Sequence, residues 1–495
     1  MVTRWLFGDQ LGPHFLADHD GPVLMVESRR VLARTQFHRQ KAHLVLSAMR
    51  HRAAELGERC DYRREPTYRE AVAHVGGPLE VVQPTSRAAV ALVRTIAEER
   101  EVVRLPERGF TTSRADFEQW AAGRGGRRLL LEDFYRDARR RLDVLMDGDE
   151  PAQGRWNLDA DNREPPPRGR PTLGVAEPRW PHEDEIDAQV RADLDAWEAD
   201  GSVSFIGRDG PRLFAATRAE ALAALEDFVT HRLGAFGPHE DAMLAGDDWM
   251  AHSLLSAPLN LGLLDPLEVV ERVEAAYRAG DVPLNSAEGF IRQVIGWRDY
   301  VWHLYWHLGE DYRHHNRLNA RRHLPDWFAQ LDADATGARC LSEVLRGVRD
   351  HGWAHHIPRL MVLGNYAMQR GWRPDEVTDW FHRAFVDGYD WVMLPNVVGM
   401  SQHADGGILA TKPYAAGGAY LNTMSDYCGG CRFNPRVRVG EDACPFTAGY
   451  WAFLHRNRER LEGNHRMARA VHGLDRLTDL DGLLQQERLR GSSPP

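Results

Sequence analysis

Apolar positions in the N-terminal part of the chain follow two alternating spacings. Short apolar runs occupy residues 5–7, 23–26 and 78–82, and each is typical of a buried strand. Over residues 44–56 and 90–97, apolar side chains instead recur every three or four positions, as on one face of a helix. Strands that alternate with helices form parallel sheets, so this part predicts a Rossmann-like α/β domain. No G-x-G-x-x-G motif is present, and we expect no dinucleotide site of the Rossmann type.

The middle of the chain interrupts this pattern. Residues from about 147 to 182 are rich in Pro, Gly and charged residues, which is typical of a linker. Beyond Thr217 the apolar spacing is helical almost to the end of the chain. We therefore divide the chain into an α/β domain over 1–140, an interdomain linker over 141–215, an all-helical domain over 216–485, and a tail over 486–495 that we expect to be disordered.

Composition narrows the class of protein. The 495 residues are 43% apolar and 27% charged, which is typical of a soluble globular protein with two or three domains. No apolar run is long enough to span a membrane, and the N-terminus does not resemble a signal peptide, so we place the protein in the cytoplasm. The net charge of −10 argues against indiscriminate binding to nucleic acid but allows a local basic groove. Lysine occurs only at Lys41 and Lys412, and arginine, which favours forked contacts to phosphate, supplies the other positive charges.

Four of the five cysteines form the most specific chemical pattern in the chain. Cys428 and Cys431 make a C-x-x-C, Cys444 follows after a loop, and Cys340 lies upstream. Four thiolates suit either zinc or an iron–sulfur cluster. A proline follows Cys444, which favours the cluster because a Cys-Pro pair also closes the ferredoxin motif. Disulfides are the competing interpretation, but the chain shows no secretory context.

Two stretches of the helical part carry polar groups that suit a cofactor. Residues 252–264 combine hydroxyls, an amide and a glycine, which can hold a diphosphate, although a capped helix start accounts for them equally well. Arg298 lies on an apolar helix and needs an anionic partner, either a carboxylate or a cofactor phosphate.

Two further stretches suit a reaction site. His355 and His356 precede an apolar helix and point in different directions, so one of them can donate a proton at the mouth of a pocket; a core position is the alternative. The long loop over 385–427 is dense in polar and aromatic residues and runs into the C-x-x-C, which indicates more than a connector.

Together these residues resemble the iron–sulfur bacterial branch of the cryptochrome/photolyase superfamily, the prokaryotic (6-4) photolyases. The resemblance spans nearly the whole chain, and its most specific part is the stretch from Asp387 to Cys431 with the four-cysteine spacing. The other shared features are Gly8-Asp9-Gln10-Leu11, Ser47-Ala-Met-Arg50, Trp156-Asn157 with Asn162-Arg163, residues 253–264, 290–298 and 355–361, and the run from Trp380 to Cys444.

The resemblance implies a cryptochrome/photolyase fold, with an α/β antenna domain followed by a helical domain that holds FAD. It implies a [4Fe–4S] cluster on Cys340, Cys428, Cys431 and Cys444, and a 6,7-dimethyl-8-ribityllumazine antenna near Gly8, Asp9, Gln10 and Glu27. The flavin residues it implies are Ser253, Leu254, Ser256, Asn260, Arg298, Asp387, Asp390 and Asn396. It further implies lesion-facing roles for His355, His356, Tyr414 and Tyr420, and an electron-transfer role for Trp380. The next residue is Phe381, where some relatives have Tyr; because Phe is a poorer redox relay, the electron route to FAD stays open.

The implied function is light-driven repair of (6-4) pyrimidine–pyrimidone photoproducts in UV-damaged DNA, as a monomer. A histidine can supply the proton that this repair needs, since its ordinary pKa is near neutrality. Damaged bases pair and stack poorly, which favours flipping the lesion out of the duplex. Three alternatives remain: a blue-light cryptochrome photoreceptor of the same fold without repair activity, a zinc-stabilised nucleic-acid-binding protein without flavin, and cyclobutane dimers as the rival substrate.

Overall fold

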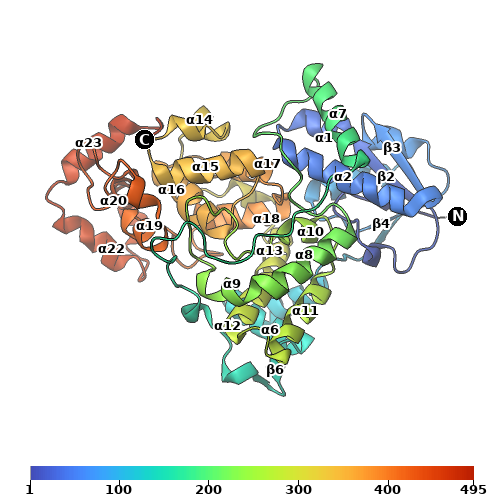
Figure 1. Ribbon diagram of the computed structural model, residues 1–495, viewed down its shortest axis with the longest axis horizontal. Coiled ribbons are helices and arrows are strands. Elements are labelled where there is room, and N and C mark those ends of the chain that lie inside the picture. Colours follow the sequence, from blue (N-terminus) through green and yellow to red (C-terminus); the bar gives the residue numbers. More distant parts are fainter. Residues whose placement is uncertain (1) are drawn as a thin grey trace.

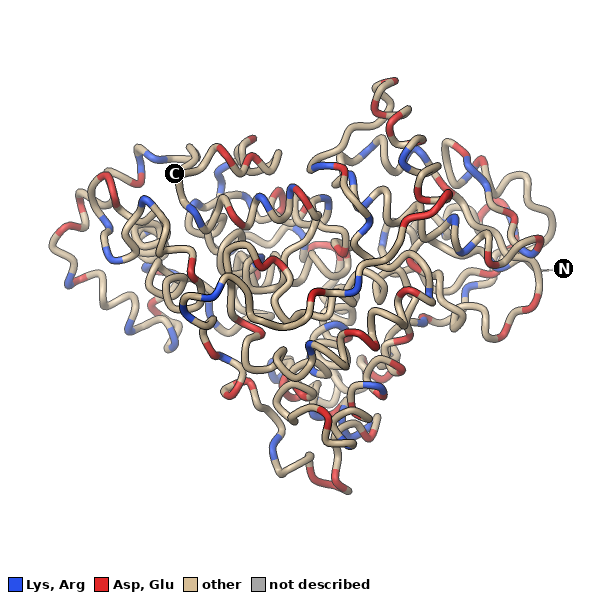
Figure 2. The backbone as a smooth tube through the Cα atoms, viewed as in Figure 1, with Lys and Arg blue, Asp and Glu red and all other residues tan. Residues whose placement is uncertain are grey.

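The computed structural model describes residues 2–495. Figure 1 shows an α/β domain at the end that carries the N-terminus, and a larger helical region that extends to the C-terminus at the opposite end. Figure 2 shows that both signs of charge are mixed along both regions, so the negative net charge is not confined to one segment. Within residues 2–495, no helix combines the length and apolar character that crossing a membrane requires.

The α/β domain is built on one parallel sheet with strand order β3-β2-β1-β4-β5. The strands are β1 (Thr3–Leu6), β2 (Val23–Ser28), β3 (Cys60–Glu65), β4 (Leu79–Val82) and β5 (Val102–Leu105). The helices around them are α1 (Arg29–Arg34), α2 (Arg39–Leu56), α3 (Tyr68–Ala73) and α4 (Arg87–Ala97). The α/β prediction for this region is therefore confirmed.

Side chains of the central strands alternate between two apolar layers. Leu6, Met25 and Val82 belong to the core shared with α2, whereas their neighbours Trp5 and Leu24 belong to a second core shared with α3 and α4. This alternation follows from the two-residue repeat of a strand. Because both faces are covered, the central strands are mainly apolar, and the charged residues Arg4 of β1 and Glu80 of β4 pair with each other.

The three strands recognised from the sequence are the three central ones, and the two not recognised are both edges of the sheet. β3 reads Cys-Asp-Tyr-Arg-Arg-Glu, and β5 is partly exposed along its length. Edge strands commonly carry charged side chains, which discourage pairing with other chains. That composition removes the apolar signal by which a strand is recognised.

The linker region contains regular structure. α5 (Arg114–Gly123) and α6 (Leu131–Leu142) precede a short hairpin of β6 (Met146–Asp147) and β7 (Glu150–Pro151). α7 (Glu185–Ala199) begins at a capping box formed by Asp184 and Asp187, and it packs on α2 of the α/β domain.

The helical region surrounds several apolar cores and contains three π-helical segments. π-Helices are rare in proteins, and those that occur are often found at functional sites. These segments are Arg292–Arg298, Pro358–Gly364 and Asn396–Ser401. The α-helices are α8 (Arg218–His231), α9 (Leu233–His239), α10 (Ser256–Asn260), α11 (Pro266–Ala279), α12 (Leu284–Ile291), α13 (Asp299–His307), α14 (Asp326–Ala329), α15 (Arg339–His351), α16 (Asn365–Arg370), α17 (Pro374–Ala384), α18 (Asp390–Pro395), α19 (Gly418–Met424), α20 (Pro445–Arg456), α21 (Arg458–Leu461), α22 (Ala468–Gly473) and α23 (Leu480–Arg490).

The two regions meet through polar contacts at the carboxyl end of β1. The backbone N–H of Leu11 donates to the carbonyl of Leu261 at 3.1 Å, and a side chain at Gly262 would collide with the carbonyl of Asp9. Lys41 of α2 is buried, and its ammonium donates to the carbonyls of His382, at 2.6 Å, and Gly388. Burial lowers the pKa of Lys41 to about 7.

The C-terminal tail differs from the expectation of disorder over 486–495. α23 extends to Arg490, and Glu487 is buried in an ion pair with Arg370. The carbonyl of Pro495 accepts a hydrogen bond from the backbone N–H of Gly337 at 2.6 Å. A polar composition suggested disorder, but a buried guanidinium at Arg370 requires an anionic partner, and this segment supplies it.

Candidate functional site

Asp387 is the polar centre of the residues assigned to the flavin. Its carboxylate accepts a hydrogen bond from the Ser256 hydroxyl at 2.6 Å and a forked pair from the Arg359 guanidinium at 2.9 and 3.0 Å. The Asn260 amide donates to the Asp387 carbonyl at 3.1 Å, and Arg359 lies 4.2 Å over the Phe385 ring. α10 and the loop before α18 are thereby held together, as the sequence assignment requires.

Arg298 lies at the end of the first π-helical segment as a buried cation without a close anion. It donates to the carbonyls of Gly109 and Leu259, at 2.7 and 3.3 Å, and its Nε has no partner among the described residues. The nearest carboxylate, Asp299, is 4.0 Å away and already accepts hydrogen bonds from the backbone N–H groups of Thr111 and Thr112. Burial lowers the pKa of Arg298 to about 10, and a bound anion would offset that effect.

Asp390 and Asn396 are directed to other neighbours. Asp390 accepts from the Tyr305 hydroxyl at 2.7 Å and pairs with Arg313, while the Asn396 amide donates to the Val392 carbonyl of its own helical segment at 2.8 Å. These two residues therefore make no direct contact with the Asp387 cluster.

The loop before α10 is strained on both sides of His252. Met250 and Leu254 have φ values of 47° and 59°, a left-handed conformation that bulky side chains rarely adopt. The Ser253 hydroxyl accepts from the backbone N–H of Leu255 at 3.3 Å, which tightens the turn. Such strain is found mainly where the surrounding fold holds a functional group in place.

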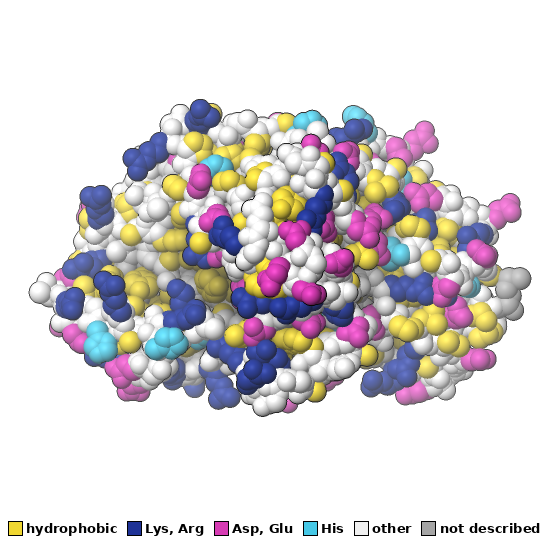
Figure 3. Space-filling model, turned by 90° about the horizontal axis from the view of Figure 1, so that it is seen from below, with side chains coloured by type: hydrophobic (Ala, Val, Ile, Leu, Met, Phe, Trp, Pro, Cys, Tyr) yellow, Lys and Arg dark blue, Asp and Glu magenta, His cyan; other side chains and the backbone are white. Residues whose placement is uncertain are grey.

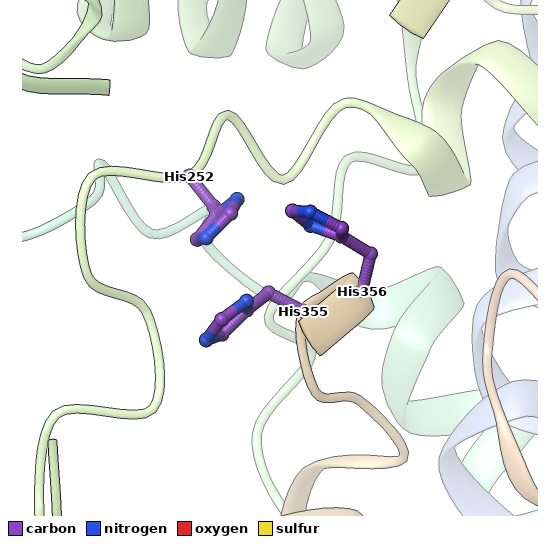
Figure 4. Close-up of side chains that lie close together, drawn as sticks. All are labelled: His252, His355 and His356. Carbon is purple, nitrogen blue, oxygen red and sulfur yellow. The ribbon is translucent and has the colours of Figure 1, made fainter. Parts of the chain in front are cut away.

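His355 and His356 do point in different directions, and they share their surroundings with His252 (Figure 4). The His355 ring is buried and stacks on His252 with 4.2 Å between ring centroids, whereas the side chain of His356 is 49% exposed. Burial, reinforced by nearby positive charge, lowers the pKa of both His252 and His355 well below the ordinary value, so both rings are neutral near pH 7. Nε2 of His356 lies 3.4 Å from a carboxylate oxygen of Asp241.

Tyr414 and Tyr420 lie in the electrostatic surroundings of the same carboxylate. Burial raises the pKa of both phenols, and the charge of Asp241 adds to the shift in each case. Beside it, Glu240 has a pKa of about 7, raised by burial. Asp241, which lies beside His356, is thus near enough to influence both tyrosines, which follow His356 by more than fifty residues along the chain.

Trp380 lies in a continuous aromatic cluster. Its buried ring packs on Phe328 and Phe385, with centroid distances of 4.6 and 5.9 Å. Phe328 also packs on Trp372 at 4.8 Å, and Trp372 lies 6.3 Å from Trp327, which is only partly buried. The aromatic rings therefore extend from the Asp387 region toward the surface.

The four cysteines from the C-x-x-C pattern line one cavity. Cys340 comes from α15 and Cys444 from the residue before α20, while Cys428 and Cys431 flank a short turn. None of the four forms a disulfide in the structure. Burial raises the pKa of the Cys428 thiol to about 12 and that of the Cys340 thiol well above its ordinary value, with the neighbouring thiols adding to both shifts. Four thiols around one cavity, two of them buried and two partly buried, fit a metal centre, which stabilises their deprotonated form.

The residues assigned to the antenna divide into two environments. Gln10 bridges β1 and β4 through the carbonyl of Val82, at 3.2 Å, and Asp9 is buried beside the hydroxyl of Thr85. A Cβ atom added at Gly8 would lie 3.0 Å from the sulfur of Met49, so a larger residue there would crowd α2. Burial raises the pKa of Asp9.

Glu27, at the end of β2, has a full set of partners. Its carboxylate accepts from Arg50 at 2.9 and 3.0 Å, from the Tyr62 hydroxyl at 2.7 Å and from Arg64 at 3.2 Å. No acceptor position of this buried carboxylate is left for a ligand.

A curated relative decides the family. The chain is 40% identical over 487 residues to a (6-4) photolyase of Agrobacterium fabrum, which covers 94% of this chain and 93% of the relative. The chain belongs to the bacterial cryptochrome/photolyase family. The family model for deoxyribodipyrimidine photo-lyase-related proteins matches residues 4–202, which include the α/β domain.

Solved photolyases share the fold. A bacterial class III photolyase from Agrobacterium tumefaciens aligns with a TM-score of 0.57 at 15% identity, over 100% of this chain and 93% of that one. An archaeal photolyase from Sulfolobus tokodaii, described as having two FAD molecules, aligns with a TM-score of 0.54 at 14% identity, over 100% and 95%. The predictions of the family and of the cryptochrome/photolyase fold are confirmed.

Three residues of this photolyase-family site were not identified from the sequence. His252 stands immediately before the assigned Ser253, Arg359 lies three positions after the assigned His356, and Asp241 precedes the strained loop. Proximity in the chain offered a weak signal for the first two. Asp241 carried none, because its relation to His356 arises only from the packing of the helical domain.

Proposed function

We propose that the protein is a DNA photolyase that uses blue light to reverse (6-4) photoproducts. The observation that carries this proposal is the 40% identity to a (6-4) photolyase along both domains, together with the histidine pair and two tyrosines around Asp241. A cofactor-free zinc protein is disfavoured, because the resemblance to a photolyase continues through the whole helical domain.

FAD fits the polar residues of the helical domain. We assign Arg298 to an anionic part of the cofactor, since its buried guanidinium has an unpartnered Nε and no close carboxylate. The remaining assigned residues are Ser253, Leu254, Ser256, Asn260, Asp387, Asp390 and Asn396. When bound and reduced, FAD supplies the excited-state electron that the reaction needs. The Asp387 cluster fixes the segments on both sides of this site relative to each other.

The two histidines divide the work of the reaction. His355 is buried and neutral, so it orients its neighbours and accepts or donates hydrogen bonds without carrying charge. His356 is half-exposed and lies beside Asp241, and it is the ring that delivers the proton to the lesion. Tyr414 and Tyr420 keep their hydroxyl protons at neutral pH, because burial raises their pKa, and they donate hydrogen bonds to the flipped-out base.

The proposed DNA face carries apolar surface and arginines together. Figure 3 shows, on the left half of the face seen from below, a recess with an apolar floor and Lys and Arg side chains along its rim. Arg163 and Arg466 are near enough to Tyr414 to lower its pKa in part. An apolar recess accepts an unstacked base, and arginines beside it neutralise the flanking phosphates.

Trp380 passes electrons to the flavin, and the route to it does not use Phe381, because phenylalanine is a poor redox relay. The electron enters at the partly exposed Trp327, moves to Trp372 and then to Trp380; the Phe328 ring, which packs on both Trp372 and Trp380, is a medium for tunnelling between them and not a relay. These tryptophans relay an electron inward from solvent. Light-driven flavin reduction that is unchanged in both Trp327→Phe and Trp372→Phe would contradict this route.

Two further groups complete the proposal. The four cysteines hold a [4Fe–4S] cluster that ties α15 to the loop before α20 and is structural in role. A ribityl-lumazine antenna binds near Gly8, Asp9 and Gln10 at the carboxyl ends of the strands, where parallel sheets bind ligands. Glu27 supports that site through its ion pairs. We propose that the protein acts as a cytoplasmic monomer, since one chain contains every assigned residue.

A blue-light photoreceptor of the same fold is the second candidate, because such proteins can retain a pocket that they no longer use. The test is a repair assay on an oligonucleotide that carries one (6-4) photoproduct, with matched dark and blue-light samples. Thymines restored only in the light establish the photolyase. Protein that contains reducible FAD but restores none supports the photoreceptor, or cyclobutane dimers as the substrate to test next.

A further inference from the structure

Two groups of side chains in the described residues have the composition and proximity of a metal site. In the first group, Nδ1 of His51 lies 2.7 Å from the Ser47 carbonyl oxygen, and Nε2 lies 3.1 Å from the Asp184 carboxylate. The third member, Asp187, pairs with Arg212. Every ligand of that group is engaged by a protein partner, so it carries no site.

The second group is His252, His355 and His356, and two of its three rings have a buried nitrogen without a partner among residues 2–495. One nitrogen from each ring lies within 4.8 Å of the others. His252 Nε2 and His355 Nδ1 are buried and have no hydrogen-bond partner among residues 2–495. Buried nitrogens of this kind are rare unless a ligand uses them. Figure 4 shows the three rings around a common space: His252 projects from a loop, and His355 and His356 come from the start of a separate helical segment.

We propose that these three histidines bind a transition-metal dication of borderline softness, with Zn²⁺ as the best match. Three imidazoles with one open position form a known type of zinc site, whereas Mg²⁺ and Ca²⁺ prefer oxygen ligands. Both buried rings are already neutral near pH 7, which is the form that binds metal.

The fold supplies the movement and the support that such a site needs. Zinc–nitrogen bonds are about 2.1 Å long, so the three nitrogens must draw closer together, and the half-exposed His356 is free to rotate. Asp241, 3.4 Å from the His356 ring, is placed to orient it as a carboxylate behind a metal-bound histidine does. Arg232 and Arg359 add positive charge near His252, and the carboxyl groups of Glu240 and Asp241 oppose it.

The consequence concerns regulation and rests on the proposed function. A metal ion that holds His355 and His356 removes them from the lesion pocket. Zinc is therefore a reversible inhibitor of binding to damaged DNA, and a chelator restores it. No covalent or redox step is involved.

The first experiment measures zinc binding directly. Holoprotein is titrated with Zn²⁺ against a chromophoric chelator near neutral pH, with His252→Gln and His356→Gln as separate site variants. The matched control is His314→Gln, because His314 lines a different pocket that contains none of the three histidines. We expect each site variant to lower the affinity for one equivalent of zinc by at least about tenfold, and we expect the control to bind zinc as the wild type does. Equal zinc affinity in the wild type and both site variants overturns the proposal.

The second experiment measures the affinity for an oligonucleotide with one (6-4) photoproduct, with and without Zn²⁺, in the dark. Zinc should lower the affinity of the wild type and of His314→Gln, and have a smaller effect in His252→Gln. An equal effect in all proteins overturns the regulatory role. Because this readout needs no catalysis, a protein that binds zinc at these residues but repairs nothing under light contradicts the proposed function and leaves the metal site supported.

Discussion

Two sites, one in each domain, differ in how completely their buried polar groups are satisfied. In the α/β domain, the Glu27 carboxylate meets Arg50, Tyr62 and Arg64, and no acceptor is left over. In the helical domain, His252 and His355 are equally buried, yet each keeps a nitrogen without a partner, and Arg298 keeps an unpartnered Nε.

This difference separates groups that stabilise the fold from groups that are prepared for a ligand. An unpaired buried polar atom costs about 1–3 kcal/mol, and a protein retains it mainly where function uses it. The thiols around the cysteine cavity belong with the second kind, since burial disfavours their charged form until a metal binds. The comparison predicts opposite outcomes for mutations in the two domains.

The largest effect is expected from Cys431→Ser. Removing one ligand from the four thiols of the cavity should prevent the metal centre from assembling. α15 is then no longer tied to the loop before α20, so most of the protein becomes insoluble. Iron and sulfide content and the visible absorbance of the soluble fraction provide the measurement. Cys60→Ser, at a cysteine outside the cavity, is the control. Soluble Cys431→Ser protein with a full cluster would show that this ligand assignment is wrong.

The next largest effect is expected on catalysis. His356→Ala should lower the rate of lesion reversal by about 10²–10⁴-fold, because a positioned proton donor contributes on that order. His355→Ala should also lower the rate, because it removes the buried ring that orients the neighbouring groups. Flavin and cluster content should stay at wild-type levels, which absorbance spectra check. If both single variants repair at the full rate, the histidines have no part in the reaction.

A change in the Glu27 ion-pair cluster should lower the stability of the protein and leave its content of bound antenna unchanged. Glu27→Gln removes the charge that Arg50 and Arg64 share, and Asp193 remains as a partner for both. We expect a loss of about 2 kcal/mol in the free energy of unfolding. Urea unfolding measures that loss, and the absorbance of bound antenna is followed in parallel. Loss of antenna at unchanged stability would reverse the comparison and make Glu27 a binding residue.

Per pH unit, the smallest effect is expected from acid. His38 and His355 have pKa values lowered by burial, to about 4 for His38, from an ordinary value of 6.5. Below pH 6.5 the unfolded chain binds protons that the folded protein does not, so stability is present above that pH and falls as the pH drops toward 4. Each such histidine contributes up to about 1.4 kcal/mol per pH unit. A melting temperature that stays constant from pH 7 to pH 5 would contradict this expectation.

The sequence by itself determined the elements whose signal is local. The central strands, the long helix α2 and the spacing of the cysteines all follow from patterns within a few residues, and the shared motifs were specific enough to indicate the family. The edge strands β3 and β5 were not predicted from the sequence, because charged side chains interrupt the apolar pattern there. The end of α23 was expected to be disordered because its composition is polar, and the sequence does not indicate the buried ion pair of Glu487 with Arg370.

Only the tertiary structure decided which groups meet. Asp387 receives Ser256 from a position 131 residues away, and His252 stacks on His355 across about a hundred residues. The proximity of Asp241 to His356, and the burial of Lys41 against Gly388, likewise depend on how helices and domains pack. Local periodicity reports which face of an element is buried and not which element covers it, and for that reason the partners within the site emerged only from the fold.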